Sequence, residues 1–131
     1  MRILLDTHIL LWAISTSERL NEAVRATILD PENDILFSAV NIWEIAIKAA
    51  RRRPDFAVHP EAVFREALDI GFIELPVRSD VAARVADLPL IHRDPFDRLL
   101  VAQAIAEPAV LYTADARLSA YSELVRLAGP V

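Results

Sequence analysis

Short apolar runs alternate with amphipathic segments along almost the whole chain. The apolar runs predict strands, and they cover residues 3–5, 35–38, 72–75, 109–113 and 124–127. The segments between them carry apolar residues at helical spacing, and they cover residues 7–14, 20–33, 41–53, 59–71, 78–88 and 94–107. Because strands and helices alternate, the pattern predicts right-handed crossovers and an α/β fold: a three-layer α/β/α sandwich around a mostly parallel sheet of four to five strands.

Capping signals support several of these helices. Asp94 precedes Pro95 at the start of an apolar helical pattern, an order typical of an N-cap followed by proline at the first helical position. Asn21 is a second N-cap candidate. Pro60 in a first turn and Gly71 just past an end bracket the helix between them.

Four acidic residues stand out against this pattern. Asp6 ends the first apolar run, Asp115 follows the fourth strand by two residues, and Glu44 lies in the first turns of the helix after the second strand. Asp97 lies in the first turn of the helix before the fourth strand, far in sequence from any strand end, although that helix can lean over the same edge. Ligand sites in open α/β sheets gather outside the carboxyl ends of the strands. We therefore expect these four carboxylates to share one site.

The chemistry of such a cluster points to a metal. Carboxylates brought together repel one another, and their pKa values rise. A divalent cation reverses this, and an oxygen-rich ligand set without cysteine suits Mg²⁺, for which Mn²⁺ can substitute. Because Mg²⁺ keeps several waters and leaves room for a phosphate oxygen, the natural reaction is metal-assisted hydrolysis of a phosphodiester.

Each acid also has a simpler local explanation. Asp6 and Asp115 can cap the helical segments that follow them. Glu44 can pair with Lys48 four residues further on, and Asp97 near a helix start favours the helix dipole. The alternative to an enzyme is therefore a non-catalytic scaffold or binding module whose acids only cap helices.

Two other functions that would use Asp6 fit the sequence less well. An aspartyl-phosphate phosphatase with Asp6 as the nucleophile needs a second acid at the position where His8 stands. A phosphorylatable receiver needs an acidic pair near the first strand, where the sequence has one acid.

Other polar and aromatic residues are less informative. His8 and His92 have no partners at metal-ligand spacing, and Trp12 and Trp43 lie in apolar helical stretches where packing is the default.

The composition fits an ordinary folded domain. Its 131 residues are 54% hydrophobic and 25% charged, so we expect one domain spanning 1–131. No apolar stretch reaches the roughly 20 residues of a membrane span, the N-terminus lacks a signal-peptide pattern, and cysteine is absent. We therefore expect a cytoplasmic protein without membrane contact. The net charge of −5 argues against a nucleic-acid partner, unless a cation neutralises several of the acids.

The residues that carry this chemistry also resemble a known family. The segments LLDTHILLWA, SAVNIWEIAIK, HRDPFDRLLVAQA and LYTADARL are similar, in this order, to the signature segments of the PIN domain, and specifically of the VapC-type ribonuclease toxins of bacterial toxin–antitoxin pairs. The likeness runs from about Arg2 to Leu118.

The resemblance implies a Mg²⁺-dependent endoribonuclease built as a small α/β/α sandwich. It implies that Asp6 and Asp97 are the main metal ligands and that Glu44 and Asp115 complete the site or position water. It also implies a homodimer that cleaves RNA, a cognate VapB-like antitoxin whose tail covers the active site, and contact with promoter DNA only through the antitoxin complex.

Two features depart from the family pattern. Asn41 stands where many relatives carry a small hydroxyl residue, and AARRRPDFAVHP replaces the Gly-Lys-Leu-type segment after the helix that holds Glu44. Both bear on substrate grip and antitoxin fit rather than on the acids. For RNA contacts the sequence offers Arg93 or Arg98, and the basic run Arg51–Arg53 can grip phosphates or complement a helix end.

Overall fold

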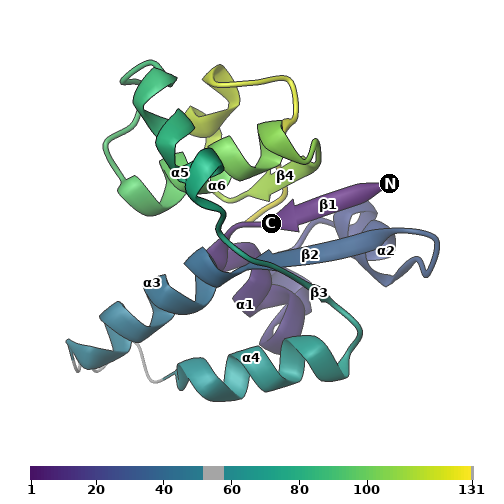
Figure 1. The fold of residues 1–131 in the computed structure, drawn as a ribbon. Coiled ribbons are helices and arrows are strands. Elements are labelled where there is room, and N and C mark those ends of the chain that lie inside the picture. Colours follow the sequence, from purple (N-terminus) through teal and green to yellow (C-terminus); the bar gives the residue numbers. More distant parts are fainter. Residues whose placement is uncertain (52–57, 131) are drawn as a thin grey trace.

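A computed structural model describes residues 1–51 and 58–130 of the chain. Over these residues a five-stranded parallel sheet, in the order β3-β2-β1-β4-β5, has helices on both faces (Figure 1). The strands are β1 (Arg2–Leu5), β2 (Asp34–Ser38), β3 (Ile73–Leu75), β4 (Val110–Thr113) and β5 (Val125–Leu127). The α-helices are α1 (Thr7–Ser15), α2 (Glu22–Leu29), α3 (Ala39–Ala50), α4 (Pro60–Asp69), α5 (Ser79–Arg84) and α6 (Pro95–Ala106). The predicted α/β/α sandwich is confirmed.

The element bounds differ from the sequence pattern in small ways. The helix expected over 78–88 is divided into α5 and a 3-10 turn, η2 (Val85–Asp87). Helix α3 begins two residues earlier than expected, because Ser38 at the end of β2 caps it. In the basic run Arg51–Arg53, Arg52 and Arg53 lie outside the described residues. None of the described helices is long and apolar enough to cross a membrane.

The strands are apolar without alternation because both faces of the sheet are covered. In β1, Ile3 and Leu5 pack into the core beneath α1, α2 and α4, whereas Leu4 packs into the core beneath α6 on the opposite face. All three side chains are fully buried. The short run that begins the chain is therefore a central strand between two cores.

The connections place several chain segments at one edge of the sheet. In a parallel sheet each connecting helix runs back against the strands, so its first turn lies at the carboxyl edge. The chain passes from β1 to β2 on one side, whereas β4 lies on the other side of β1, after a crossover through α5 and α6 (Figure 1). The carboxyl ends of β1 and β4 therefore flank the point where strand order reverses, which is where open α/β sheets bind ligands.

Asn41 ties this edge together. Its side chain is fully buried in the first turn of α3. Its Oδ1 accepts a hydrogen bond from the backbone N–H of Ser38 at 2.7 Å. Its Nδ2 donates to the carbonyl of Leu5 at 3.2 Å and to the Thr7 hydroxyl oxygen at 3.1 Å. One amide side chain thus joins the end of β1, the end of β2 and the starts of α1 and α3.

Replacing Asn41 by alanine should be strongly destabilising. The substitution removes all three bonds and leaves buried backbone groups unpaired, so we expect a loss of about 2–4 kcal/mol in the free energy of unfolding. Urea denaturation measures this. The matched control is Asn33→Ala, which removes a single bond to the Thr27 carbonyl and should cost less than about 1.5 kcal/mol. Equal losses in the two variants would contradict the role given to Asn41.

Candidate functional site

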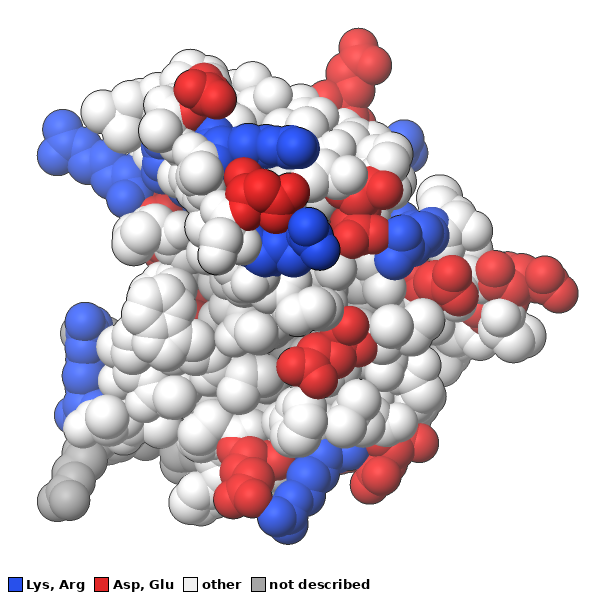
Figure 2. Space-filling model, viewed as in Figure 1, with Lys and Arg blue, Asp and Glu red and all other residues white. Residues whose placement is uncertain are grey.

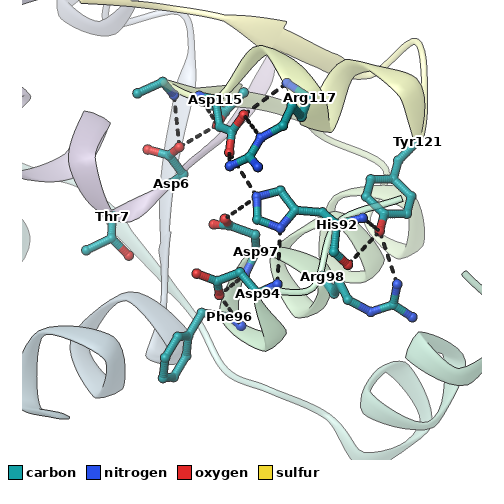
Figure 3. Close-up of polar contacts among 12 residues, drawn as sticks. Asp6, Thr7, His92, Asp94, Phe96, Asp97, Arg98, Asp115, Arg117 and Tyr121 are labelled. Carbon is teal, nitrogen blue, oxygen red and sulfur yellow. Dashed lines mark hydrogen bonds and ion pairs between the residues drawn. The ribbon is translucent and has the colours of Figure 1, made fainter. Parts of the chain in front are cut away.

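A cleft of about 440 Å³ opens at the carboxyl edge of the sheet. The four acids singled out by sequence, Asp6, Glu44, Asp97 and Asp115, all line it. Asp94, which the sequence assigned to capping, lines it as well. The remaining lining residues are Thr7, His8, Trp12, Lys48, His92, Ala114, Ala116 and Arg117. Figure 3 shows several of these side chains around the edge of α6 and the loop after β4.

Both carboxylate oxygens of Asp6 accept hydrogen bonds, and the residue is only 5% exposed. Its Oδ1 accepts the backbone N–H of Ile9 at 2.9 Å, which caps α1. Its Oδ2 accepts the Thr113 hydroxyl at 2.5 Å and the N–H of Ala114 at 3.0 Å. Burial raises the pKa of Asp6 above its usual value, although these hydrogen bonds oppose the rise. The carboxylate is therefore fixed in orientation, and none of the ion pairs among residues 1–51 and 58–130 includes it.

Glu44 is buried in the second turn of α3. The Thr7 hydroxyl donates to its Oε1 at 2.6 Å, and Lys48 Nζ pairs with its Oε2 at 2.6 Å. Because the Thr7 oxygen already accepts from Asn41 Nδ2, the threonine proton is directed to the glutamate. The predicted pairing of Glu44 with Lys48 is present, yet both side chains line the acidic cleft.

Asp97 lies in the first turn of α6 and has few donors of its own. Asp94 caps the helix: its Oδ1 accepts the N–H of Phe96 at 2.8 Å and that of Asp97 at 3.2 Å. Burial raises the pKa of Asp97 to about 7, and the negative charges of Asp94, Asp6 and Glu44 add to the rise. The Asp97 carboxyl group therefore meets the combined field of the other acids.

Asp115 has the opposite environment. Its Oδ1 accepts the backbone N–H of Arg117 at 3.0 Å and so caps η3 (Ala116–Ala120). The Arg117 guanidinium holds both carboxylate oxygens, with Nε 3.1 Å from Oδ1 and Nη2 2.8 Å from Oδ2. These bonds, together with one from His92, keep the pKa of Asp115 well below its ordinary value. Asp115 thus stays ionised where Asp97 is poised to take up a proton.

His92 also lines this cleft, although residue spacing in the sequence predicts no partner for it. Its Nδ1 accepts the backbone N–H of Asp94 at 3.1 Å, so the proton of the neutral imidazole lies on Nε2. That nitrogen lies 2.9 Å from Asp115 Oδ2 and 3.6 Å from Asp97 Oδ2 (Figure 3). Ligand atoms of His92, Asp97 and Asp115 all lie within 4.8 Å of one another. His92 precedes the capping Asp94 by two residues, but nothing local predicts its contact with Asp115.

Arg98, which the sequence offers for an RNA contact, is engaged in hydrogen bonds within the protein. Its guanidinium donates to the Tyr121 hydroxyl at 3.0 Å and to the carbonyls of Val85, Leu88 and Pro89. The Tyr121 hydroxyl in turn accepts the backbone N–H of His92 at 2.9 Å. Arg98 therefore fixes the segment that carries His92. Arg93 is exposed and is not among the residues that line the cleft.

The sequence predicts packing in the core or at an interface for the two tryptophans; Trp12 packs against the core beside the cleft, and Trp43 lies on the surface. Trp43 is 57% exposed and makes an edge contact with Phe96, with ring centroids 5.0 Å apart. Trp12 is half-buried and lines the cleft beside His8. Both indoles lie on helices that begin at the carboxyl edge of the sheet.

Comparison with known proteins gives consistent matches over most of the chain. The sequence profile of the PIN domain family matches residues 3–124. Ribonuclease VapC22 from Mycobacterium tuberculosis is 29% identical over 120 residues, which cover 91% of each sequence. VapBC2 from Rickettsia felis, solved bound to a DNA fragment from its promoter, has a similar fold, with a TM-score of 0.67 at 19% identity over 95% of this chain and 96% of that chain. VapC20 from M. tuberculosis, a toxin that cleaves the sarcin-ricin loop, gives a TM-score of 0.59 at 18% identity over 90% of this chain and 93% of that chain.

Asp97 and Asp115 should affect stability with opposite signs. Because the folded-state pKa of Asp97 is about 7, its ionisation destabilises the native state as pH rises from about 4 to 7. In EDTA at about pH 8, Asp97→Asn should raise the free energy of unfolding by about 1–3 kcal/mol, with little effect near pH 4. Asp115→Asn should instead lower stability at about pH 8, and this loss should shrink as pH falls below about 4, where the unfolded carboxyl group is protonated. Urea denaturation at both pH values tests the pair, and shifts of the same sign at pH 8 would contradict it.

Proposed function

The chain belongs to the PIN domain family, and we propose that it is a metal-dependent endoribonuclease of the VapC toxin type. The observation that carries this proposal is the meeting of Asp6, Glu44, Asp97 and Asp115 in one cleft, where burial raises the pKa of two of them. RNA as the substrate is supported by the names of two relatives, a ribonuclease and a toxin that cleaves the sarcin-ricin loop.

The donor set fits a hard divalent cation. Carboxylate oxygens predominate in the cleft, and the protein has no cysteine, so Mg²⁺ or Mn²⁺ suits it better than a thiolate-seeking metal. We assign Asp6 and Asp97 as the main ligands, as the likeness to the PIN family implies; burial raises the pKa of both, and a bound cation would favour their charged forms. Glu44 and Asp115 complete the site. When bound, the cation supplies polarisation of the phosphoryl group and a more acidic water.

The surrounding residues orient the acids before substrate arrives. Thr113 and the amide of Ala114 hold Asp6, while Thr7 and Lys48 hold Glu44. His92 and Arg117 hold Asp115. In this arrangement the Nε2 proton of His92 makes it a hydrogen-bond donor rather than a metal ligand. In the reaction the oxygen of water bonds to phosphorus, one phosphorus–oxygen ester bond breaks, and the departing ribose oxygen takes a proton.

The partners follow from the family and from the charge of the cleft. We propose a cognate VapB-like antitoxin with a basic segment, whose arginine can pair with the cleft acids by charge-assisted hydrogen bonds. The VapBC2 complex from R. felis, solved with promoter DNA, supports contact with DNA through such a complex. We further propose that the single PIN domain forms a homodimer and acts in the cytoplasm.

The dimer is tested by multi-angle light scattering on the purified chain. We expect the mass of two chains at micromolar concentration. A mass of one chain across the accessible concentration range would contradict the homodimer and leave the nuclease assignment to its own test.

The nuclease assignment is tested on Asp6→Asn and Asp97→Asn. We expect each to lower Mg²⁺-dependent cleavage of total RNA by about 100-fold or more, as is typical when one fixed electrostatic group is removed from an active site. Both variants should remain folded by circular dichroism. The matched control is Asp69→Asn, which changes an exposed aspartate at the end of α4 and should cleave at the wild-type rate.

A thermal-melting series separates the enzyme from a non-catalytic scaffold. A ligand that binds the native state must raise the melting temperature, so Mg²⁺ or Mn²⁺ should stabilise the wild type and Asp69→Asn, and should stabilise Asp97→Asn much less. Absence of any shift in the wild type would favour the scaffold. Full cleavage by Asp97→Asn would reject the assigned ligands.

A further inference from the structure

One wall of the catalytic cleft is aromatic. His8 and Trp12 lie one turn apart on α1, the helix that begins directly after Asp6, and both line the same cleft as the acids. Their ring centroids are 5.9 Å apart with the planes tilted by 48°. His8 is exposed and Trp12 is half-buried. The exposed His8 ring, which packs on the Trp12 indole, is therefore available to a ligand two residues from Asp6, a proposed metal ligand.

Two other residues, Arg19 and Gly129, also lie close to the Trp12 ring. The Arg19 guanidinium lies over it, 5.3 Å from the ring centroid. Gly129, near the C-terminal end, approaches so closely that a Cβ there would lie 3.0 Å from Trp12 Cζ3 and 2.9 Å from the carbonyl oxygen of Arg19. Because the indole is already confined, a ligand that stacks on this wall orders little additional side-chain motion.

The cleft offers few free cations to a polyanion. Among the described residues, the lysine and arginine side chains that line it are Lys48 and Arg117, and both are already paired, with Glu44 and Asp115 respectively. On the face in Figure 2, Lys and Arg side chains are scattered among Asp and Glu without a broad basic area. Phosphate contacts, which dominate most nucleic-acid binding, are therefore scarce here. Uncharged contacts must therefore contribute much of the binding free energy for RNA.

We propose that His8 and Trp12 form a nucleobase subsite, on which an unpaired base next to the scissile phosphate stacks. This rests on the proposed ribonuclease function and adds to it a base contact made by two residues of α1. Every base has a π-face, so stacking tolerates sequence. Bases inside an RNA duplex are stacked on one another and do not reach such a wall, whereas bases in loops and ends do.

The chain contains two tryptophans, and this makes the subsite directly observable. Trp43 is exposed on α3 and is not among the residues that line the cleft. The variant Trp43→Phe therefore leaves Trp12 as the sole indole reporter. We would titrate it with a single-stranded RNA hexamer in EDTA, which prevents metal-dependent cleavage, and follow tryptophan fluorescence.

The matched ligand control is a set of hexamers with one abasic nucleotide at each position in turn. All retain the phosphates and differ only in the missing base. We expect the intact hexamer to quench Trp12 fluorescence, and one or two abasic positions to weaken binding by about tenfold. Equal quenching and affinity for intact and abasic RNA would overturn the subsite.

Protein variants give a second, independent measurement. We expect Trp12→Leu to weaken binding of the hexamer by about tenfold and Trp12→Phe, which keeps a ring, by less. The matched control Trp43→Leu, which removes the other indole, should bind as the wild type does. Should Trp12→Leu fail to fold, His8→Ala and Trp12→Phe carry the same comparison. Equal weakening by Trp12→Leu and Trp43→Leu would overturn the proposal, as would quenching by a basic peptide but not by RNA.

The two proposals fail separately. If quenching depends on the base but no RNA is cleaved with Mg²⁺ or Mn²⁺, the nuclease assignment falls and the base subsite remains. If RNA is cleaved but abasic and intact hexamers bind alike, the nuclease assignment remains and the subsite falls.

Discussion

Repulsion among carboxylates at one edge of a parallel sheet is the constraint on which the rest of this structure depends. Asp6, Glu44 and Asp97 come from three separate parts of the chain and line one cleft. Each would be costly alone, because burial disfavours the charged form. The fold supports them with short-range donors: the Thr113 hydroxyl for Asp6, Thr7 and Lys48 for Glu44. Asp97 is the least compensated of the three, because burial and the neighbouring negative charges raise its pKa to about 7.

Capping a helix and lining the proposed metal site are compatible roles for the same acid. Asp6 and Asp115 each use one carboxylate oxygen to cap the helical turn that follows, and a carboxylate has further lone pairs to offer. Helices in a parallel α/β fold start at the edge where strands end. An acid that caps the first turn of such a helix therefore lies beside the crevice where ligands bind. The pairing of Glu44 with Lys48 likewise occurs inside the cleft.

Parts of the site were within reach of sequence reasoning, and others were not. The position of Asp97 follows from topology alone, since the first turn of a helix that precedes a parallel strand lies at the carboxyl edge. His92 is different. Its contact with Asp115 depends on the path of a loop that Arg98 and Tyr121 hold in place. No periodicity or spacing encodes that path, so the link from Arg98 through Tyr121 to the backbone of His92 is visible only in the structure.

The alternation of strands and helices, the caps at Asn21 and Asp94 and the presence of four well-placed acids are properties of the sequence itself, because periodicity and side-chain chemistry are local. The family likeness rests on the same residues. Strand order, the exposure of Trp43 and the opposite pKa shifts of Asp97 and Asp115 were decided only by the tertiary structure. Burial and the distance between charges depend on which distant segments meet, and a linear sequence holds neither quantity.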